Sequence, residues 1–283
     1  MPRVLRSSQS PMSLPRIESP KNPRIVAAAK LLDRKARGRA ELYLVEGWRL
    51  VRAALEAGIG IEEMYVTREA LERPGAGTMA ASLLTQNVPV FEATGAVIAR
   101  LSDTEAPQGI VAVARRVDAR LEDLRLRRPP LLLAADAVSD PGNFGSLARI
   151  AGAAAADALV SLPGCCDWTS PKVLRASMGG VFLTPMVAAP PEALIAFARA
   201  HRLSRAALVA HGGESIYDAN LTEGLALILG NEAAGIRPDL LEHCDRRLTI
   251  PMPGPAESLN VTAAAAIVVF EALRQRRAAS RQP

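Results

Sequence analysis

Apolar residues recur along the chain in short runs, and segments with helical spacing separate most of these runs. In the second half, the runs predict strands at residues 131–135, 158–162, 182–187, 206–210, 225–229 and 247–250. In the first half, the pattern predicts helices at residues 25–37 and 48–57, and strands at residues 42–45, 63–67, 88–91 and 109–113. Strands that alternate with helices indicate an α/β protein, with a mostly parallel sheet in its second half.

The pattern also predicts a division of the 283 residues into domains. Residues 1–21 form a basic, flexible N-terminal segment, and residues 22–114 form a first α/β domain. Residues 115–130 are highly charged and end in two prolines, which is typical of a linker. Residues 131–283 form the second domain, and its last helix, residues 263–277, is Ala-rich and predicted to be buried.

Polar loops follow three of the apolar runs in the second domain. Asp140-Pro141-Gly142-Asn143 comes after the first of these runs, and Gly230-Asn231-Glu232 comes after the second. A loop stiffened by prolines follows the third run and leads through Ser258 and Asn260 into the last helix. Each junction predicts a strand end that carries polar side chains.

These three segments resemble the signature motifs of the SpoU, or TrmH-like, family of RNA ribose 2′-O-methyltransferases, which belongs to the SPOUT superfamily. The resemblance rests on Asn143 with Arg149 six residues later, on Gly230-Asn231-Glu232 with Gly235-Ile236, and on Ile250-Pro251-Met252 with Ser258-Leu259-Asn260-Val261. It extends from residue 22 to residue 277. Three motifs in order with matching spacing are a specific signal, whereas one alone would be weak.

The resemblance implies a C-terminal SPOUT domain with a parallel sheet and a trefoil knot, a smaller N-terminal α/β domain similar to ribosomal RNA-binding proteins, and a homodimer. It also implies S-adenosyl-L-methionine as the cofactor, bound through backbone groups at Gly230, Ile250 and Leu259. A glycine at position 230 would let the backbone approach the cofactor closely. The catalytic residues implied by the motifs are Arg149, Asn143, Glu232, Ser258 and Asn260.

The role expected of Arg149 follows from the chemistry of its guanidinium group. A guanidinium group stays protonated at neutral pH, so it is a poor general base. We therefore expect Arg149 to bind the target phosphate and to stabilise the developing 2′-oxyanion, with that phosphate as a candidate proton acceptor. The alternative interpretation, which the motif spacing disfavours, is a solvated arginine on a helix surface.

Charge is distributed unevenly. Through residue 39 the chain has ten Lys and Arg against two acids, a net charge of +8, which leaves −3 for the rest. A basic arm suits RNA, because phosphate contacts supply much of the affinity for nucleic acid. A solvated disordered tail and a transit peptide are alternative interpretations of this segment. The residues predicted to contact RNA are Arg34, Lys35, Arg37, Lys172 and Arg175.

Other observations narrow the class of protein. The three cysteines show no Cys-x-x-Cys or Cys/His spacing, which favours a reducing compartment and no metal site. We expect no membrane span, and the excess of Arg over Lys suggests the cytoplasm of a bacterium with a GC-rich genome. The predicted function is methylation of structured RNA, with 23S-type rRNA as the preferred target. A tRNA methyltransferase, a resistance enzyme that acts on one rRNA nucleotide, and a non-catalytic RNA-binding or ribosome-assembly protein are the alternatives.

Overall fold

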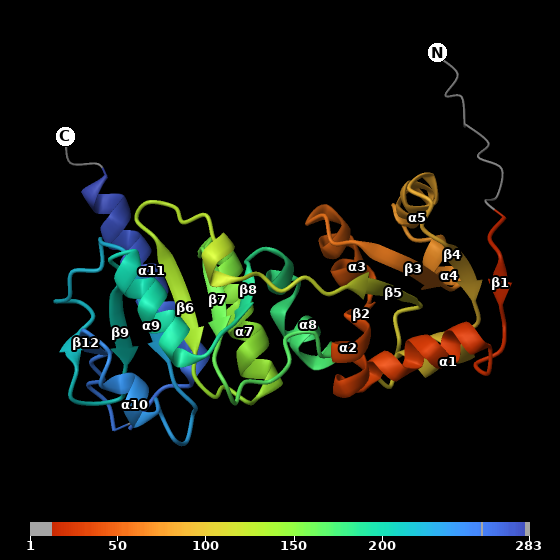
Figure 1. The fold of residues 1–283 in the computed structure, drawn as a ribbon. Helices are drawn as coiled ribbons and strands as arrows, with labels where there is room; N and C mark the ends of the chain where they lie inside the picture. The colour runs from red at the N-terminus through yellow and green to blue at the C-terminus, as the bar shows by residue number, and fades with distance from the viewer. Residues whose placement is uncertain (1–12, 256, 281–283) are drawn as a thin grey trace, which may run out of the picture. The chain divides into compact units, whose positions relative to one another are not determined.

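The computed structural model describes residues 13–255 and 257–280, and the chain divides into two compact units, residues 1–115 and residues 116–283 (Figure 1). We call these the first and second units. The interpretations of the N-terminal arm as an RNA contact, a tail or a transit peptide fall largely on residues 1–12, which lie outside the described residues. The predicted flexible segment does not extend to residue 21, because Arg16–Ile17 forms a strand and Asn22 caps a helix.

The first unit is a sheet with helices on both faces, and α1 and α6 lie against the opposite face from α3 and α5 (Figure 1). Its strand order is β1-β4-β3-β5-β2, with β5 antiparallel to both of its neighbours. The elements are β1 (Arg16–Ile17), α1 (Pro23–Ala29), the 3-10 helix η1 (Lys30–Leu32), α2 (Arg34–Ala40), β2 (Leu42–Glu46), α3 (Trp48–Glu56), β3 (Ile61–Val66), α4 (Arg68–Leu71), α5 (Ala76–Thr85), β4 (Val90–Ala93), α6 (Gly95–Leu101) and β5 (Ile110–Arg115).

The continuous helix predicted at residues 25–37 is wrong, because the chain breaks it at Asp33. This residue is extended, with φ −85° and ψ 135°, and its Oδ1 accepts the backbone N–H groups of Lys35 at 2.9 Å and Ala36 at 3.0 Å. An aspartate that satisfies these otherwise free donors starts a new helix, so α1, η1 and α2 are separate elements.

The second unit has seven strands in the order β10-β12-β9-β11-β6-β7-β8, and every neighbouring pair is parallel. The mostly parallel sheet predicted from the sequence is confirmed. The elements are the 3-10 helix η2 (Leu121–Asp123), β6 (Leu131–Ala135), α7 (Pro141–Ala153), β7 (Ala158–Ser161), α8 (Pro171–Ser177), the 3-10 helix η3 (Gly180–Phe182), β8 (Met186–Ala188), α9 (Pro191–Ala200), β9 (Ser204–Leu208), β10 (Glu214–Ser215), β11 (Leu225–Leu229), α10 (Pro238–Leu241), β12 (Arg246–Thr249) and α11 (Val261–Ala279).

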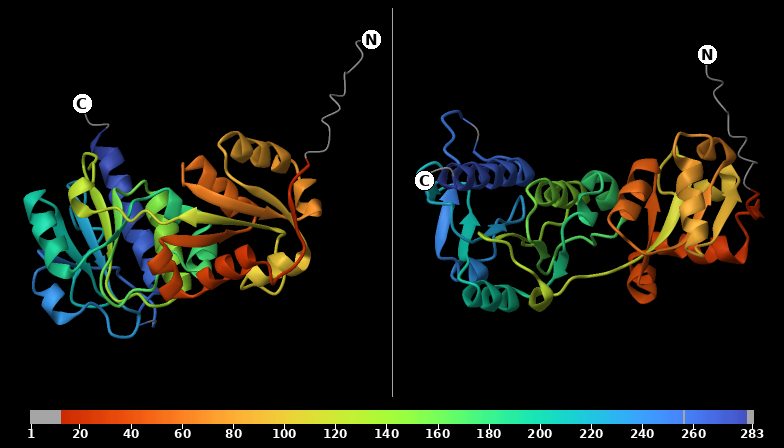
Figure 2. Two further views of the ribbon diagram at one scale, coloured as in Figure 1. Left: turned by 45° about the vertical axis from the view of Figure 1, so that its right-hand side comes forward. Right: turned by 90° about the horizontal axis from the view of Figure 1, so that it is seen from above.

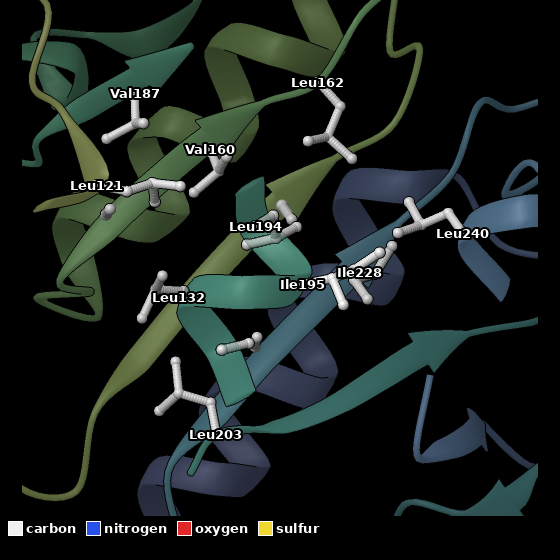
Figure 3. Close-up of a cluster of buried hydrophobic side chains, with 14 residues drawn as sticks. Leu121, Leu132, Val160, Leu162, Val187, Leu194, Ile195, Leu203, Ile228 and Leu240 are labelled. Atoms are coloured by element: carbon white, nitrogen blue, oxygen red, sulfur yellow. The ribbon is translucent and has the colours of Figure 1, made fainter. Parts of the chain in front are cut away.

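Helices cover both faces of this sheet. All residues of β6 and β11 are buried, as expected for central parallel strands, which need apolar side chains on both sides. On one face, Leu194 and Ile195 of α9 pack over Leu132, Val160 and Ile228 (Figure 3). Helices α7, α8 and α11 cover the other face (Figure 2, right). The sheet is therefore a rigid support for the loops at its ends.

The segment interpreted as a linker belongs to the second unit. Ala119 forms a parallel bridge with Val187, and Leu121 is buried in the core beneath α9. The indole Nε1 of Trp168 also donates to Asp118 at 2.7 Å. Residues 116–124 therefore extend the core of this unit. Ala119 and Leu121 pack against it, although most of their neighbours in the sequence are charged.

Two further expectations for this unit need correction. The strand predicted at residues 182–187 begins only at Met186, because the preceding residues form η3. Helix α11 is not buried all round: Val268 and Val269 are buried, but Ile267 is 36% and Phe270 48% exposed. An apolar stripe of this helix thus remains open to a further contact.

Candidate functional site

Two of the three polar loops, those that follow β11 and β12, line one cavity of about 400 Å³ at the carboxyl ends of β9, β11 and β12. In open parallel sheets, this end is where ligands bind, because the loops there are free of the packing within the sheet. The cavity is lined by Leu208, Val209, Ala210, Leu229, Gly230, Asn231, Glu232, Gly235, Ile236, Ile250, Met252, Ser258, Leu259, Asn260, Val261 and Ala264. Six residues predicted for the site are therefore together: Gly230, Glu232, Ile250, Ser258, Leu259 and Asn260.

Asn143 joins this group through its side-chain amide. Its Nδ2 donates to Glu232 Oε1, and its Oδ1 accepts from Asn260 Nδ2 at 3.0 Å. One residue from each of the three motifs thus forms a continuous hydrogen-bonded chain. The arrangement fixes the orientation of the Asn143 amide, because one end meets an acceptor and the other a donor.

Both asparagines sit where a helix begins. Asp140 caps α7 by accepting the Asn143 N–H at 2.8 Å, and Pro141 occupies the first turn. Asn260 caps α11, with Oδ1 accepting the Thr262 N–H at 2.9 Å. Asn260 therefore both caps α11 and contacts Asn143, so a capping role and a role in the site are compatible.

The structure gives a reason for a glycine at position 230 that the sequence did not indicate. A Cβ atom there would lie 2.3 Å from the carbonyl carbon of Gly235 and 2.5 Å from the nitrogen of Ile236. The close neighbour is thus the chain itself, which doubles back through hydrogen bonds between Asn231 and Gly235 at 2.9 and 3.0 Å. The missing side chain lets this loop fold tightly against the cavity wall.

A buried ion pair, which the sequence patterns did not predict, fastens the same loop to the end of β6. The carboxylate of Asp136 is 1% exposed and accepts both the backbone N–H and the Nε of Arg237, each at 2.8 Å. Arg237 also donates to the Pro163 carbonyl at 3.0 Å, and Asn231 Nδ2 donates to the Ala137 carbonyl at 2.9 Å. The sequence signal was an aspartate that directly follows an apolar run.

We expect Asp136→Ala to lower the free energy of unfolding by roughly 3 kcal/mol, because it leaves the Arg237 guanidinium and a loop N–H without their acceptor. Urea denaturation monitored by circular dichroism measures the change. Asp239→Ala is the control, because that carboxylate is exposed on the same stretch of chain and makes no ion pair with any described residue. An equal, small effect of both substitutions would contradict a clamping role for Asp136.

The basic residues predicted for the site fall into different surroundings. Arg149 and Lys172 are exposed and do not line the cavity, whereas Arg175 is half-buried. Arg34 and Lys35 are exposed on α2 of the first unit. The RNA contact predicted for Arg37 is wrong. The residue is 3% exposed, and its Nη1 donates to the carbonyls of Leu31 and Leu32 at 3.0 and 2.9 Å. It therefore holds the turn before α2 and is not available to RNA.

The cysteines offer no reactive group near the cavity. Burial raises the pKa of the Cys166 thiol to about 12 and that of Cys244 to about 11, and it also raises the pKa of Cys165. Within residues 13–255 and 257–280, no three His, Cys, Asp or Glu side chains gather as metal ligands. In the same part of the chain, no helix is long and apolar enough to cross a membrane.

We expect the thiols of the folded protein to resist iodoacetamide at pH 7.5, because alkylation requires the thiolate and these pKa values keep the thiols protonated. Mass spectrometry should find little modification before unfolding and three modified cysteines after it. Rapid alkylation of the native protein would show that one thiol is accessible and ionised.

Two family models match the chain. The SpoU rRNA methylase family matches residues 130–270, and the MRM3-like substrate binding domain matches residues 22–112. The 23S rRNA (guanosine(2553)-2′-O)-methyltransferase RlmP of Bacillus subtilis is 34% identical, and the alignment covers 90% of this chain and 97% of that protein. The 23S rRNA (uridine(2479)-2′-O)-methyltransferase of Streptomyces viridochromogenes is 30% identical, with 88% of each chain covered.

A solved structure shows the same similarity in three dimensions. The AdoMet-bound rRNA methyltransferase of Sinorhizobium meliloti superimposes with a TM-score of 0.84 at 29% sequence identity. The match covers 92% of this chain and 98% of that one. It therefore includes both units.

Proposed function

This chain belongs to the SpoU rRNA methylase family, and from that premise we propose that it methylates the ribose 2′-hydroxyl of an rRNA nucleotide with S-adenosyl-L-methionine as donor. The observation that carries the proposal is that the second and third motif loops line one cavity, and that Asn143 of the first motif is hydrogen-bonded to Glu232 and Asn260 of its lining. Scattered motif residues would have supported only the fold.

The cavity suits the proposed cofactor. Its volume of about 400 Å³ lies within the range of small-ligand sites. Ile236, Met252 and Leu259 provide apolar walls for a purine ring, and the strand ends at Leu208–Ala210 and Leu229–Gly230 offer backbone groups. We expect Gly230, Ile250 and Leu259 to bind the cofactor through their backbone. When bound, S-adenosylmethionine would supply a sulfonium methyl group for transfer to the ribose oxygen.

The protein's task in such a displacement is alignment and removal of one proton. Glu232 and Asn260 hold the Asn143 amide, and Asn143 and Ser258 position the ribose beside the cavity. Arg149 lies on the same helix as Asn143 but outside the cavity lining, so it contacts RNA rather than the cofactor. Its guanidinium binds the target phosphate and stabilises the 2′-oxyanion, and that phosphate accepts the proton.

The proposed substrate is 23S-type rRNA. Relatives that align over most of both chains are named as 23S rRNA 2′-O-methyltransferases, and the first unit matches a substrate-binding domain model. Arg34 and Lys35 of that unit, and Lys172 and Arg175 of the second unit, are the proposed phosphate contacts. The relatives' names favour this substrate over tRNA, and the assembled site argues against a non-catalytic role. The cytoplasm, where thiols remain reduced and rRNA is made, is the proposed location.

We propose further that the second unit is a trefoil knot and that the protein is a homodimer. The knot would place the 250–261 loop beside the 230–236 loop, and both line the cavity. The dimer is supported by the exposed apolar stripe of α11, to which Ile267 and Phe270 contribute. A stripe of this kind on a helix of a folded unit is typical of an interface.

We expect Phe270→Arg to convert the dimer to a monomer, because it places a charge in the apolar stripe. Sedimentation velocity measures the change in mass. Val117→Arg is the matched control, since Val117 is also exposed but does not belong to α11, and this variant should remain dimeric. A parent protein that sediments as a monomer would contradict the proposed dimer directly.

The experiment that tests the function measures transfer of tritiated methyl groups from S-adenosylmethionine to RNA from a strain that lacks this protein. rRNA, tRNA and ribosomal particles are offered separately. We expect label in the large rRNA, either naked or in the particle. Label only in tRNA would establish the tRNA alternative. No label and no cofactor binding by calorimetry would favour the non-catalytic RNA-binding protein.

A further inference from the structure

A second hollow of the second unit lies at the amino ends of the strands, whereas the cavity lies at their carboxyl ends. It is a groove of about 740 Å³ lined by residues 127–130, 201–202 and 222–224, which directly precede β6, β9 and β11. An adjoining hollow of about 520 Å³ shares Arg202 and Glu223 with it and adds Arg199 and Arg205. We call the two together the amino-edge groove. Because the cavity lies at the carboxyl ends of the strands, one ligand the size of the cofactor cannot occupy both.

Arginine side chains dominate the amino-edge groove. Arg128, Arg199 and Arg202 are exposed and make no ion pair with any residue that the structure describes. Three others are partly neutralised: Arg127 Nε lies 3.3 Å from Asp157 Oδ1, Arg205 pairs with Asp245, and Arg246 pairs with Glu214. The exposed acid that lines both hollows is Glu223. The groove thus carries an excess of positive charge, although the chain beyond residue 39 has a net charge of −3.

The backbone at Arg202 adds an independent observation. Helix α9 ends at Ala200, and Arg202 follows with φ +55°, in the left-handed region. Glycine or asparagine is favoured at this place after a helix, because a Cβ atom is strained there. The sequence nevertheless has a long cationic side chain at this position and directs it into the groove.

We propose that the amino-edge groove binds the phosphate backbone of the RNA substrate, as a contact separate from the catalytic cavity. Guanidinium groups that are exposed, unpaired and spread over adjoining hollows match a polyanion rather than one small anion, because successive phosphates can meet successive arginines. His201 at the groove adds an aromatic face, packed on Phe197 with a centroid distance of 4.3 Å. An RNA strand here anchors the substrate without touching the reacting ribose.

This inference rests on the proposed function for the identity of the polyanion, since an RNA methyltransferase must hold a large structured RNA. It predicts two kinds of RNA contact on the second unit. Residues of the cavity position one nucleotide, and the amino-edge groove supplies sequence-independent affinity. Removal of the unpaired arginines of the groove should therefore raise KM for RNA and leave the affinity for cofactor unchanged.

The test compares two double variants that remove the same charge. The variant with Arg199→Gln and Arg202→Gly removes two unpaired cations from the groove. Glycine adopts the left-handed backbone at position 202 without strain, so the melting temperature should not fall. Arg120→Gln with Arg274→Gln removes two exposed arginines that are already paired with acids. Filter binding of a 23S rRNA transcript is measured at several salt concentrations, and calorimetry measures S-adenosylmethionine binding.

We expect the groove variant to bind the transcript on the order of 10-fold more weakly at 0.15 M salt, with a salt slope reduced by about 1.5. The control variant should bind like the parent, and all three should bind the cofactor equally. Equal losses in the two variants, or no loss in the groove variant, would overturn the proposal. If the parent transfers no methyl group but the groove variant still loses RNA affinity, the proposed methyltransferase function is wrong, and the proposal that the groove binds RNA is retained.

Discussion

Arg149→Ala is expected to lower the rate of methyl transfer by about 10²- to 10³-fold, the magnitude associated with loss of one group that stabilises a developing oxyanion. Affinity for S-adenosylmethionine should not change, because Arg149 is exposed and does not line the cavity. Single-turnover transfer to rRNA measures the chemical step, and calorimetry measures cofactor binding. A fall in kcat without a fall in cofactor affinity assigns Arg149 to the transfer itself.

Two variants separate this role from a general effect of charge. Arg149→Lys keeps the charge but loses the planar fork of donors, so its rate should lie between those of the parent and the alanine variant. Arg247→Ala removes another exposed arginine of the second unit and should retain the parent rate. Activity of Arg149→Ala close to that of the parent would exclude Arg149 from catalysis and leave it as a solvated residue of α7.

Gly230→Ala is expected to reduce affinity for S-adenosylmethionine by roughly 10- to 100-fold, corresponding to the roughly 1–3 kcal/mol that overpacking costs in a tight site. The new Cβ would lie 2.3 Å from the Gly235 carbonyl carbon, so residues 235 and 236 must move. Both line the cavity, and a shift there changes its shape. Calorimetry measures the affinity, and thermal unfolding shows whether the variant is folded.

Gly254→Ala is the matched control for this substitution. Gly254 belongs to the proline-rich loop, and a Cβ atom there would meet no atom within 4 Å. This variant should bind cofactor like the parent. If Gly230→Ala also bound normally while remaining folded, the contact between residues 230 and 235 would not shape the cofactor site.

The sequence predicted the second sheet well because its central strands leave little ambiguity. β6 and β11 are buried on both faces, so their unbroken apolar runs coincide with the observed strands at residues 131–135 and 225–229. β1 and β10 were missed, because two residues are too few to show a period. The break at Asp33 was also missed, since the apolar spacing continues across it and only the cap marks the new helix.

The candidate site was predicted from motif spacing, but the physical reasons for several residues needed the fold. Gly230 meets its own loop, a contact between residues five positions apart that no spacing rule indicates. Asp136 and Arg237 pair across a hundred residues of sequence, and each looks like an ordinary charged residue at a strand or helix end. Arg37 was misplaced because a basic helix pattern cannot distinguish a solvated arginine from one that donates to a preceding turn.

The most direct test of the central claim locates the methyl group within the labelled rRNA. Alkali cleaves RNA through attack by the 2′-hydroxyl, so a 2′-O-methyl group leaves an uncleaved dinucleotide, whereas a methylated base is released in a mononucleotide. The parent protein should place the tritium in one alkali-resistant dinucleotide from 23S rRNA, and Arg149→Ala should place little or none there. Tritium recovered in mononucleotides would show methylation of a base and would contradict the proposed ribose 2′-O-methyltransferase activity.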